Sequence, residues 1–258
     1  MAVYKIFPTK DTTVYTEYPD MNTGMDEIVE LIPKTTRSNF SQILMAFDFG
    51  EINDIGLDFS NIDIKTNLKL FIAQSSSLPA NLFISANPIT TKWENGTGRF
   101  KDERTRNSGA TYRMRDRENF WGENPLTSTP KYDDSILALS EISIYTSKDI
   151  NLDVTPLFEY WKSQTNNGLI ITAEDGSVES INNASLKYFS RDTHTIYPPC
   201  LEIKWDDSKI LPHQTLTVTD SDLYIGLSNN KGEFNENSIN KFRVNVRPKH
   251  PKRKYQRA

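Results

Sequence analysis

Short apolar runs separated by polar turn residues recur along most of the chain. In one run, Leu68, Leu70 and Ile72 fall on one face while Lys69 and Phe71 fall on the other. A period of two is typical of a half-buried β-strand. Comparable runs predict strands at 28–32, 43–49, 82–86, 142–145, 168–173, 186–189 and 201–205. Many short strands joined by Asn, Ser, Thr, Pro and Gly predict an all-β fold, an antiparallel sandwich or jelly roll.

One short helix interrupts this strand pattern at residues 155–161. Thr155 suits the N-cap, and Pro156 suits the first helical position, where a missing N–H costs nothing. Leu157 and Trp161 then share a face. We expect a single helical turn that closes one end of the sandwich.

A domain boundary is predicted after Asp207, which ends the last strand of the first unit. Residues 1–207 form the sandwich, and residues 208–258 form a smaller β extension with strands at 216–218, 223–227 and 242–246. About 50 residues are too few for a secure core of their own, so we expect this segment to lean on another surface. The two prolines of 247–255 predict an extended arm.

Composition removes several classes of protein. The chain has one cysteine and three histidines among 258 residues, which excludes an internal disulfide framework and a cysteine-based zinc site. Cys200 opens an apolar strand and is predicted to be a buried small residue. No apolar run is long enough to cross a membrane. The first ten residues lack the pattern of a secretion signal.

Charge separates the end of the chain from the rest. Residues 241–258 carry eight bases and no acid, whereas residues 1–240 carry 22 bases and 34 acids, a net charge of −12. The basic arm could dock on an acidic groove of a neighbouring subunit, remain solvated, or bind nucleic acid. The acidic body and the lack of interleaved aromatic residues argue against nucleic acid. Docking is favoured, through Arg243, Arg247, Lys249, Lys252, Arg253, Lys254 and Tyr255.

No catalytic set emerges from the sequence, so we expect a protein that is not an enzyme and binds no cofactor. Gly96-Thr97-Gly98 lacks the third glycine of a nucleotide-binding loop. His194 lies in a polar loop, and the paired carboxylates lie where turns are expected. A structural calcium ion is a weaker hypothesis, with oxygens from Asp11, Asp20, Asn22 or Asp153, whose spacing does not match an EF-hand.

The tryptophans divide into two groups. Trp161 and Trp205 lie in periodic apolar contexts and are predicted core residues. Trp93 and Trp121 lie in loops, where they either plug the end of the sandwich or, together with Tyr112, contact a glycan or a protein partner. The plug is the favoured interpretation, because a buried indole is normally anchored.

Several motifs, in order, resemble those of DNRLRE-type domains, jelly-roll modules related to carbohydrate-binding modules. The resemblance covers about three quarters of the chain. Its arginine-containing strand motif is changed here, because Ser41 to Asp48 lacks the arginines. The matching passages are Asp11-Thr12-Thr13-Val14-Tyr15, Pro19-Asp20-Met21-Asn22-Thr23-Gly24, Trp93-Glu94-Asn95-Gly96-Thr97-Gly98, Gly109-Ala110-Thr111-Tyr112, Leu152 to Leu157 with Trp161, Asn166-Asn167-Gly168-Leu169, and Tyr197 to Ile203.

This resemblance implies a two-sheet antiparallel jelly roll in a family that binds glycans or builds surface structures, with no catalytic residues to carry over. The strand and basic arm at 242–255 are also similar to terminal segments in structural proteins of tailed-bacteriophage virions. Such proteins assemble in the host cytoplasm and need no secretion signal.

The leading hypothesis is therefore a structural component of a tailed-phage virion, placed in the neck, tail, baseplate, fibre attachment or head decoration. Its expected partners are other virion proteins, in a homo-oligomer or symmetric ring. The alternative is a carbohydrate-binding module or adhesin that recognises host glycans through Trp93, Tyr112 and Trp121. A polysaccharide-degrading enzyme is a third hypothesis, which needs a pair of carboxylates across a cleft.

Overall fold

A computed structural model describes residues 2–34, 39–50, 64–76, 78, 80–100, 108–143, 145–175 and 184–206, and two strands at 223–228 and 243–248. The chain divides into two compact units, residues 1–209 and 210–258. The boundary predicted after Asp207 lies two residues before this division.

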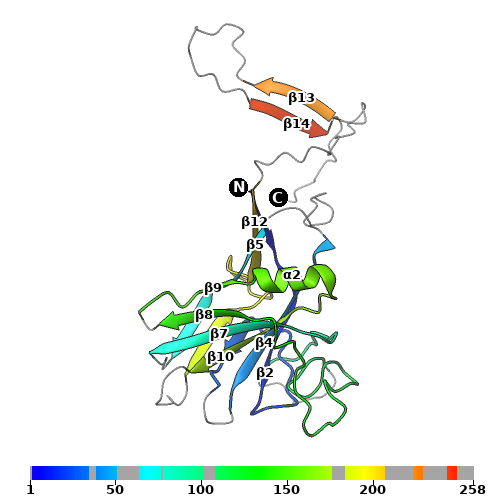
Figure 1. Ribbon diagram of the computed structural model, residues 1–258, viewed down its shortest axis with the longest axis vertical. Helices are drawn as coiled ribbons and strands as arrows, with labels where there is room; N and C mark the ends of the chain where they lie inside the picture. The colour runs from blue at the N-terminus through cyan, green and yellow to red at the C-terminus, as the bar shows by residue number, and fades with distance from the viewer. Residues whose placement is uncertain are drawn as a thin grey trace. The chain divides into compact units, whose positions relative to one another are not determined.

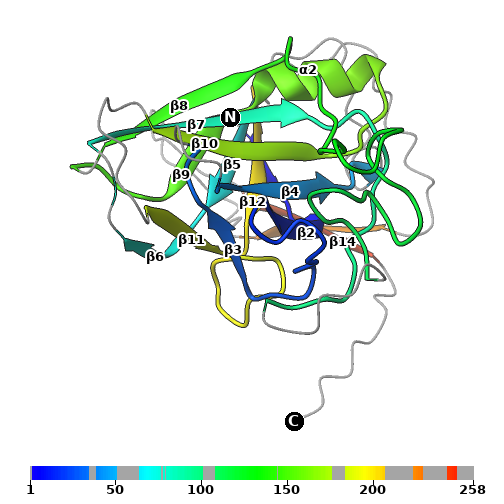
Figure 2. The same ribbon diagram turned by 90° about the horizontal axis from the view of Figure 1, so that it is seen from below.

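The described residues of the larger unit form three antiparallel sheets (Figures 1 and 2). The largest has the order β2 (Pro8–Tyr15), β4 (Ser41–Phe47), β10 (Leu169–Asp175), β7 (Asn81–Pro88), β8 (Ala138–Ser143). The second has the order β1 (Ala2–Ile6), β12 (Cys200–Trp205), β5 (Ile64–Leu70), β9 (Ile150–Asp153). The third has the order β3 (Ile28–Leu31), β11 (Ser185–Phe189), β6 (Ile72–Ser76).

The predicted all-β antiparallel sandwich is confirmed. Successive strands leave the five-stranded sheet and return to it, which is the strand exchange of a jelly roll (Figure 2). The two-sheet expectation needs one correction, because the smaller strands form two sheets rather than one. The apolar run at 68–73 shows the reason: β5 ends at Leu70 and β6 begins at Ile72 in another sheet.

All three sheets contribute side chains to one large core. The inward positions of the five-stranded sheet alternate along each strand, as Ile43 and Met45 do in β4. Leu68, from β5, and Tyr188, from β11, meet them from the other two sheets. On the four-stranded sheet, polar side chains occupy outward positions, where Lys69 pairs with Glu202 across neighbouring strands at 2.8 Å.

The helix α2 (Thr155–Ser163) differs from its prediction at both ends. It has nine residues rather than a single turn, and its N-cap is Val154 rather than Thr155. The Thr155 hydroxyl instead accepts a hydrogen bond from the Thr66 N–H at 2.9 Å, so it ties the helix to β5. Leu157 and Trp161 are buried as predicted.

The smaller unit is described only as a two-stranded antiparallel ribbon. Its strands are β13 (Leu223–Ser228) and β14 (Arg243–Pro248), close to the predicted 223–227 and 242–246. The predicted strand at 216–218 lies outside the described residues. In the part of the chain that the structure describes, no helix has the length and hydropathy to cross a membrane.

Candidate functional site

Asn22 joins two of the motifs that carry the family resemblance. Its amide nitrogen donates to the carbonyl oxygens of Asn95 and Ala110 at 2.8 and 2.7 Å. Its amide oxygen accepts from the N–H groups of Gly24 and Gly98 at 3.2 and 2.9 Å. With every donor and acceptor of its amide engaged, Asn22 is a structural cross-link between two loops.

Gly96 and Gly109 allow those loops to approach each other. Both have positive φ angles, 81° and 142°, which side-chain-bearing residues rarely adopt. A Cβ on Gly96 would lie 2.1 Å from the Ser108 carbonyl oxygen, and one on Gly109 would lie 2.4 Å from Gly96. The glycines of these motifs therefore serve close backbone packing.

Trp93 and Trp121 are buried, with exposed fractions of 1% and 3%. Each indole N–H donates to a backbone carbonyl, that of Asn167 at 2.8 Å and that of Thr111 at 2.9 Å. Both rings pack on the outer face of the five-stranded sheet, against a second apolar cluster that contains Ile170. Both indoles are buried, as the plug interpretation expects, but they cover the outer face of the five-stranded sheet rather than an end of the sandwich. This burial argues against the glycan contact predicted through these two rings.

The same outer face is open beyond this cluster. There a groove of about 380 Å³ crosses four strands, and loops wall it on one side. Its lining is mixed and includes Lys34, Phe40, Gln42, Ser85, Asn87, Tyr112, Thr129, Pro130, Tyr132, Asp134, Leu137, Leu139, Thr172 and Glu174.

Tyr112 is the one predicted aromatic contact that the structure places at this groove. Its ring packs edge-on against Phe40, with centroids 6.0 Å apart. Partial burial, together with nearby Tyr132, raises the pKa of the Tyr112 hydroxyl. Tyr132, Leu137 and Leu139 were not predicted from the sequence, although the alternation of Leu137 and Leu139 is a signal that the sequence contains.

The floor of the groove is already hydrogen bonded. The Gln42 amide donates to the Thr172 hydroxyl at 3.0 Å, and the Asn87 amide donates to the Ile136 carbonyl at 2.9 Å. These amide donors are used within the protein, so the groove combines the exposed side chains of Leu137 and Leu139 with a mixed polar lining.

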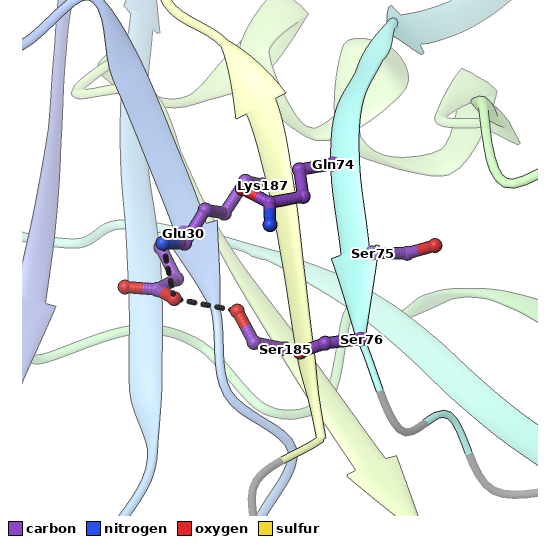
Figure 3. A pocket seen from close by; sticks show the side chains of 6 residues that line it. All are labelled: Glu30, Gln74, Ser75, Ser76, Ser185 and Lys187. Carbon is purple, nitrogen blue, oxygen red and sulfur yellow. Dashed lines mark hydrogen bonds and ion pairs between the residues drawn. The ribbon is translucent and has the colours of Figure 1, made fainter.

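A small polar pocket lies on the three-stranded sheet, around Glu30 (Figure 3). The Glu30 carboxylate accepts from the Ser185 hydroxyl at 2.5 Å and from the Tyr15 hydroxyl at 3.1 Å. Lys187 completes the set with an ion pair at 3.7 Å. A single carboxylate held by three partners is a stable polar cluster, and it provides no acid–base pair within this pocket.

Other predicted chemical residues also have structural roles. His194 is largely exposed and faces Glu27 at 3.6 Å, in accord with a surface histidine. Cys200 is buried as predicted, and burial raises the pKa of its thiol, which opposes nucleophilic reactivity.

The four residues proposed as calcium ligands do not form one site. Asp11 accepts from the Arg191 N–H at 2.7 Å, and Asp153 accepts from the Thr155 N–H at 3.0 Å in another sheet. Both lone-pair directions of the Asn22 amide oxygen are already used. Among the residues that the structure describes, no group of three His, Cys, Asp or Glu side chains is placed to hold a metal.

The ribbon has one apolar face. Ile225 lies opposite Val246, and Leu227 lies opposite Val244, so four aliphatic side chains form two cross-strand pairs. Their exposed fractions are between 48% and 63%. The alternation of these residues was readable in the sequence, but their exposure was not.

Charge distinguishes the two units as well. Residues 1–209 carry 21 bases and 30 acids, a net charge of −9, whereas residues 210–258 carry nine bases and four acids, a net charge of +5. Arg243 and Arg247 lie in β14. The other predicted contacts of the arm, Lys249, Lys252, Arg253, Lys254 and Tyr255, lie outside the described residues.

A scan against protein-family models finds no match, and a search of the curated proteins finds no relative. The likeness to DNRLRE-type domains therefore rests on the motifs, for which Asn22 and the glycines around it provide a structural reason.

Proposed function

We propose that this protein is a non-enzymatic structural component of a tailed-phage virion, assembled in the host cytoplasm, that docks to neighbouring subunits through its C-terminal segment. The observation that carries the docking is the apolar face of the ribbon, formed by Ile225, Leu227, Val244 and Val246. An isolated two-stranded ribbon is at best marginally stable in water. Covering each aliphatic side chain contributes up to about 1.5–3 kcal/mol. Burial of these side chains against a partner would therefore both stabilise the ribbon and favour binding.

Electrostatics supports the same proposal. A segment of net charge +5 attached to a body of net charge −9 favours contact with an acidic protein surface over contact with nucleic acid. The motifs that resemble surface-building jelly rolls support a virion setting for the body.

The glycan alternative keeps one of its three predicted contacts. Trp93 and Trp121 are buried, which leaves Tyr112 at the groove. A glycan array with a variant of the groove therefore tests sugar binding.

Incorporation into particles tests the proposal. Replacing Val244 and Val246 together by Asp should lower the amount of protein in purified virions at least tenfold, because two charges would have to be buried in the interface. A matched control is Ile196→Asp, which changes a residue with an exposed fraction of 85% in the body and should be neutral.

Truncation after Val246 removes six of the eight bases of residues 241–258, so the incorporation that remains should be weaker and less sensitive to salt than that of the full chain. The Debye length falls from about 10 Å at 0.1 M to about 3 Å at 1 M salt, so added salt should weaken docking of the full chain, which keeps the complete arm. If virions made with the double Asp variant contained as much of this protein as virions made with the wild type, docking through this segment would be ruled out.

A further inference from the structure

The groove lies beside β8, which is the edge strand of the five-stranded sheet among the residues that the structure describes and which also contacts β9 and α2. β8 pairs with β7 on one side and ends the sheet on the other (Figure 2). Leu137 and Leu139, at its start, have exposed fractions of 48% and 59% and line the groove. Proteins commonly protect such edges with charges or a covering segment, because exposed apolar edges invite pairing with another chain.

We propose that the groove of one copy receives the ribbon of a second copy of this chain. The inference rests on the proposed function and names the partner of the docking segment. The apolar face of the ribbon provides Ile225, Leu227, Val244 and Val246, and the groove provides its two leucines and Tyr132. The ribbon face is apolar and exposed, and the groove sets its exposed leucines among polar side chains, which is the arrangement of an apolar centre with a polar rim that protein interfaces show.

Charge complementarity favours this head-to-tail contact over a contact between two ribbons. The segment of residues 210–258 has a net charge of +5, so two such segments repel each other. At the groove, Asp134 and Glu174 outnumber Lys34, and exposed Glu141 follows on β8. The basic segment of one copy is therefore attracted to the acidic groove of another copy, whereas two basic segments repel each other.

A head-to-tail contact joins two different patches, so it builds a closed ring or an open filament rather than an isolated dimer. This outcome agrees with the homo-oligomer or ring expected from the sequence. Sugar binding would have to use other donors of the groove, because the amides of Gln42 and Asn87 on its floor already donate within the protein.

Two variants of the full chain test the contact by complementation. Leu139→Lys alters the groove, and the pair Val244→Asp and Val246→Asp alters the ribbon; both target exposed residues, and circular dichroism checks that the body is folded. In sedimentation velocity, the wild-type protein should form concentration-dependent oligomers, and each variant alone should associate roughly tenfold or more weakly. A mixture should form a one-to-one dimer that does not grow, because one intact ribbon meets one intact groove.

The control is Leu126→Lys, which changes a leucine with an exposed fraction of 82% outside the groove and should assemble normally. A wild-type protein that remains monomeric at all concentrations overturns this inference and leaves docking to another virion protein intact. Loss of assembly in the ribbon variant but not in Leu139→Lys also overturns the groove while it supports the proposed function.

Two further outcomes distinguish a failure of both proposals from a failure of this inference alone. Virion incorporation and self-assembly that survive the ribbon variant overturn both proposals. Normal assembly of Leu139→Lys, combined with glycan-array binding that this substitution abolishes, assigns the groove to a sugar and overturns the inference.

Discussion

Asn22 shows why a short polar motif can be necessary in a protein without catalytic residues. The side chain is 3% exposed and makes four hydrogen bonds to backbone groups, three of them in two distant loops and one to Gly24 in its own loop. Hydrogen bonds of this kind define where the loops lie, and the loops in turn cover the outer face of the five-stranded sheet. The sequence revealed the motif, whereas the partners of Asn22, more than 70 residues away, depend on the tertiary fold.

Asn22→Ala should destabilise the body by about 3 kcal/mol or more, because it leaves buried backbone donors and acceptors unpaired. Urea unfolding monitored by tryptophan fluorescence measures this change. Asn151→Ala, at an exposed position of β9, is the matched control and should stay within about 0.5 kcal/mol of wild type. Equal stability of the two variants would contradict a structural role for the motif.

Asp11 gives the body a pH dependence of the less common sign. Burial raises the pKa of its carboxyl from 3.8 to about 7, against the opposing hydrogen bond from the Arg191 N–H. Between these two values the folded chain holds a proton that the unfolded chain has lost. The contribution of Asp11 to the free energy of unfolding is therefore fully present below about pH 4 and is lost as the pH rises to about 7.

Asp11→Asn should consequently gain stability relative to wild type between pH 5 and pH 8, by about 2 kcal/mol. The amide keeps an oxygen that can accept the Arg191 N–H and cannot ionise. Urea midpoints of both proteins at the two pH values measure the difference. A constant difference across this range would show that the Asp11 carboxyl does not titrate there.

At the scale of elements, the sequence predicted the strands that have a clear pattern of apolar residues. Apolar runs located most of the sandwich: in β5 the inward and outward positions alternate in polarity, whereas β4 is a continuous apolar run buried on both faces. This pattern missed β1, β2 and β9, whose polar or short runs gain their burial only from neighbouring strands. Sheet order was not predictable, because pairing joins segments such as β10 and β4 that are far apart in the sequence.

The helix illustrates the same limit. Pro156 correctly indicated where α2 begins, but Thr155 was assigned a capping role from its type alone. In the folded chain its hydroxyl is used by the Thr66 N–H, a contact between elements 89 residues apart. Local preference identified the helix, and tertiary contact decided the role of its first side chain.

At the scale of the whole molecule, charge and composition indicated the segment that we propose for docking, whereas they did not indicate the groove that we propose as its receiving surface. The basic end was visible in the sequence, and the apolar pairs of the ribbon agree with a need for a partner. The groove combines residues from four strands and several loops, from Lys34 to Glu174, so no single stretch of sequence reveals it.

The division of the chain after Lys209 leads to a prediction about independent stability. Every buried residue of the two apolar clusters lies before this point, so a protein of residues 1–209 should retain the core of the sandwich. Its melting temperature should stay within about 4 °C of that of the full chain, the shift expected for a change below about 1 kcal/mol in a domain of this size.

A peptide of residues 210–258 should be unfolded alone, because a two-stranded ribbon without a partner surface cannot offset its loss of conformational entropy. Differential scanning calorimetry of the truncated protein and circular dichroism of the peptide measure both expectations. A folded peptide would mean that the ribbon is an independent module, and the argument that it needs a partner to be stable would fail.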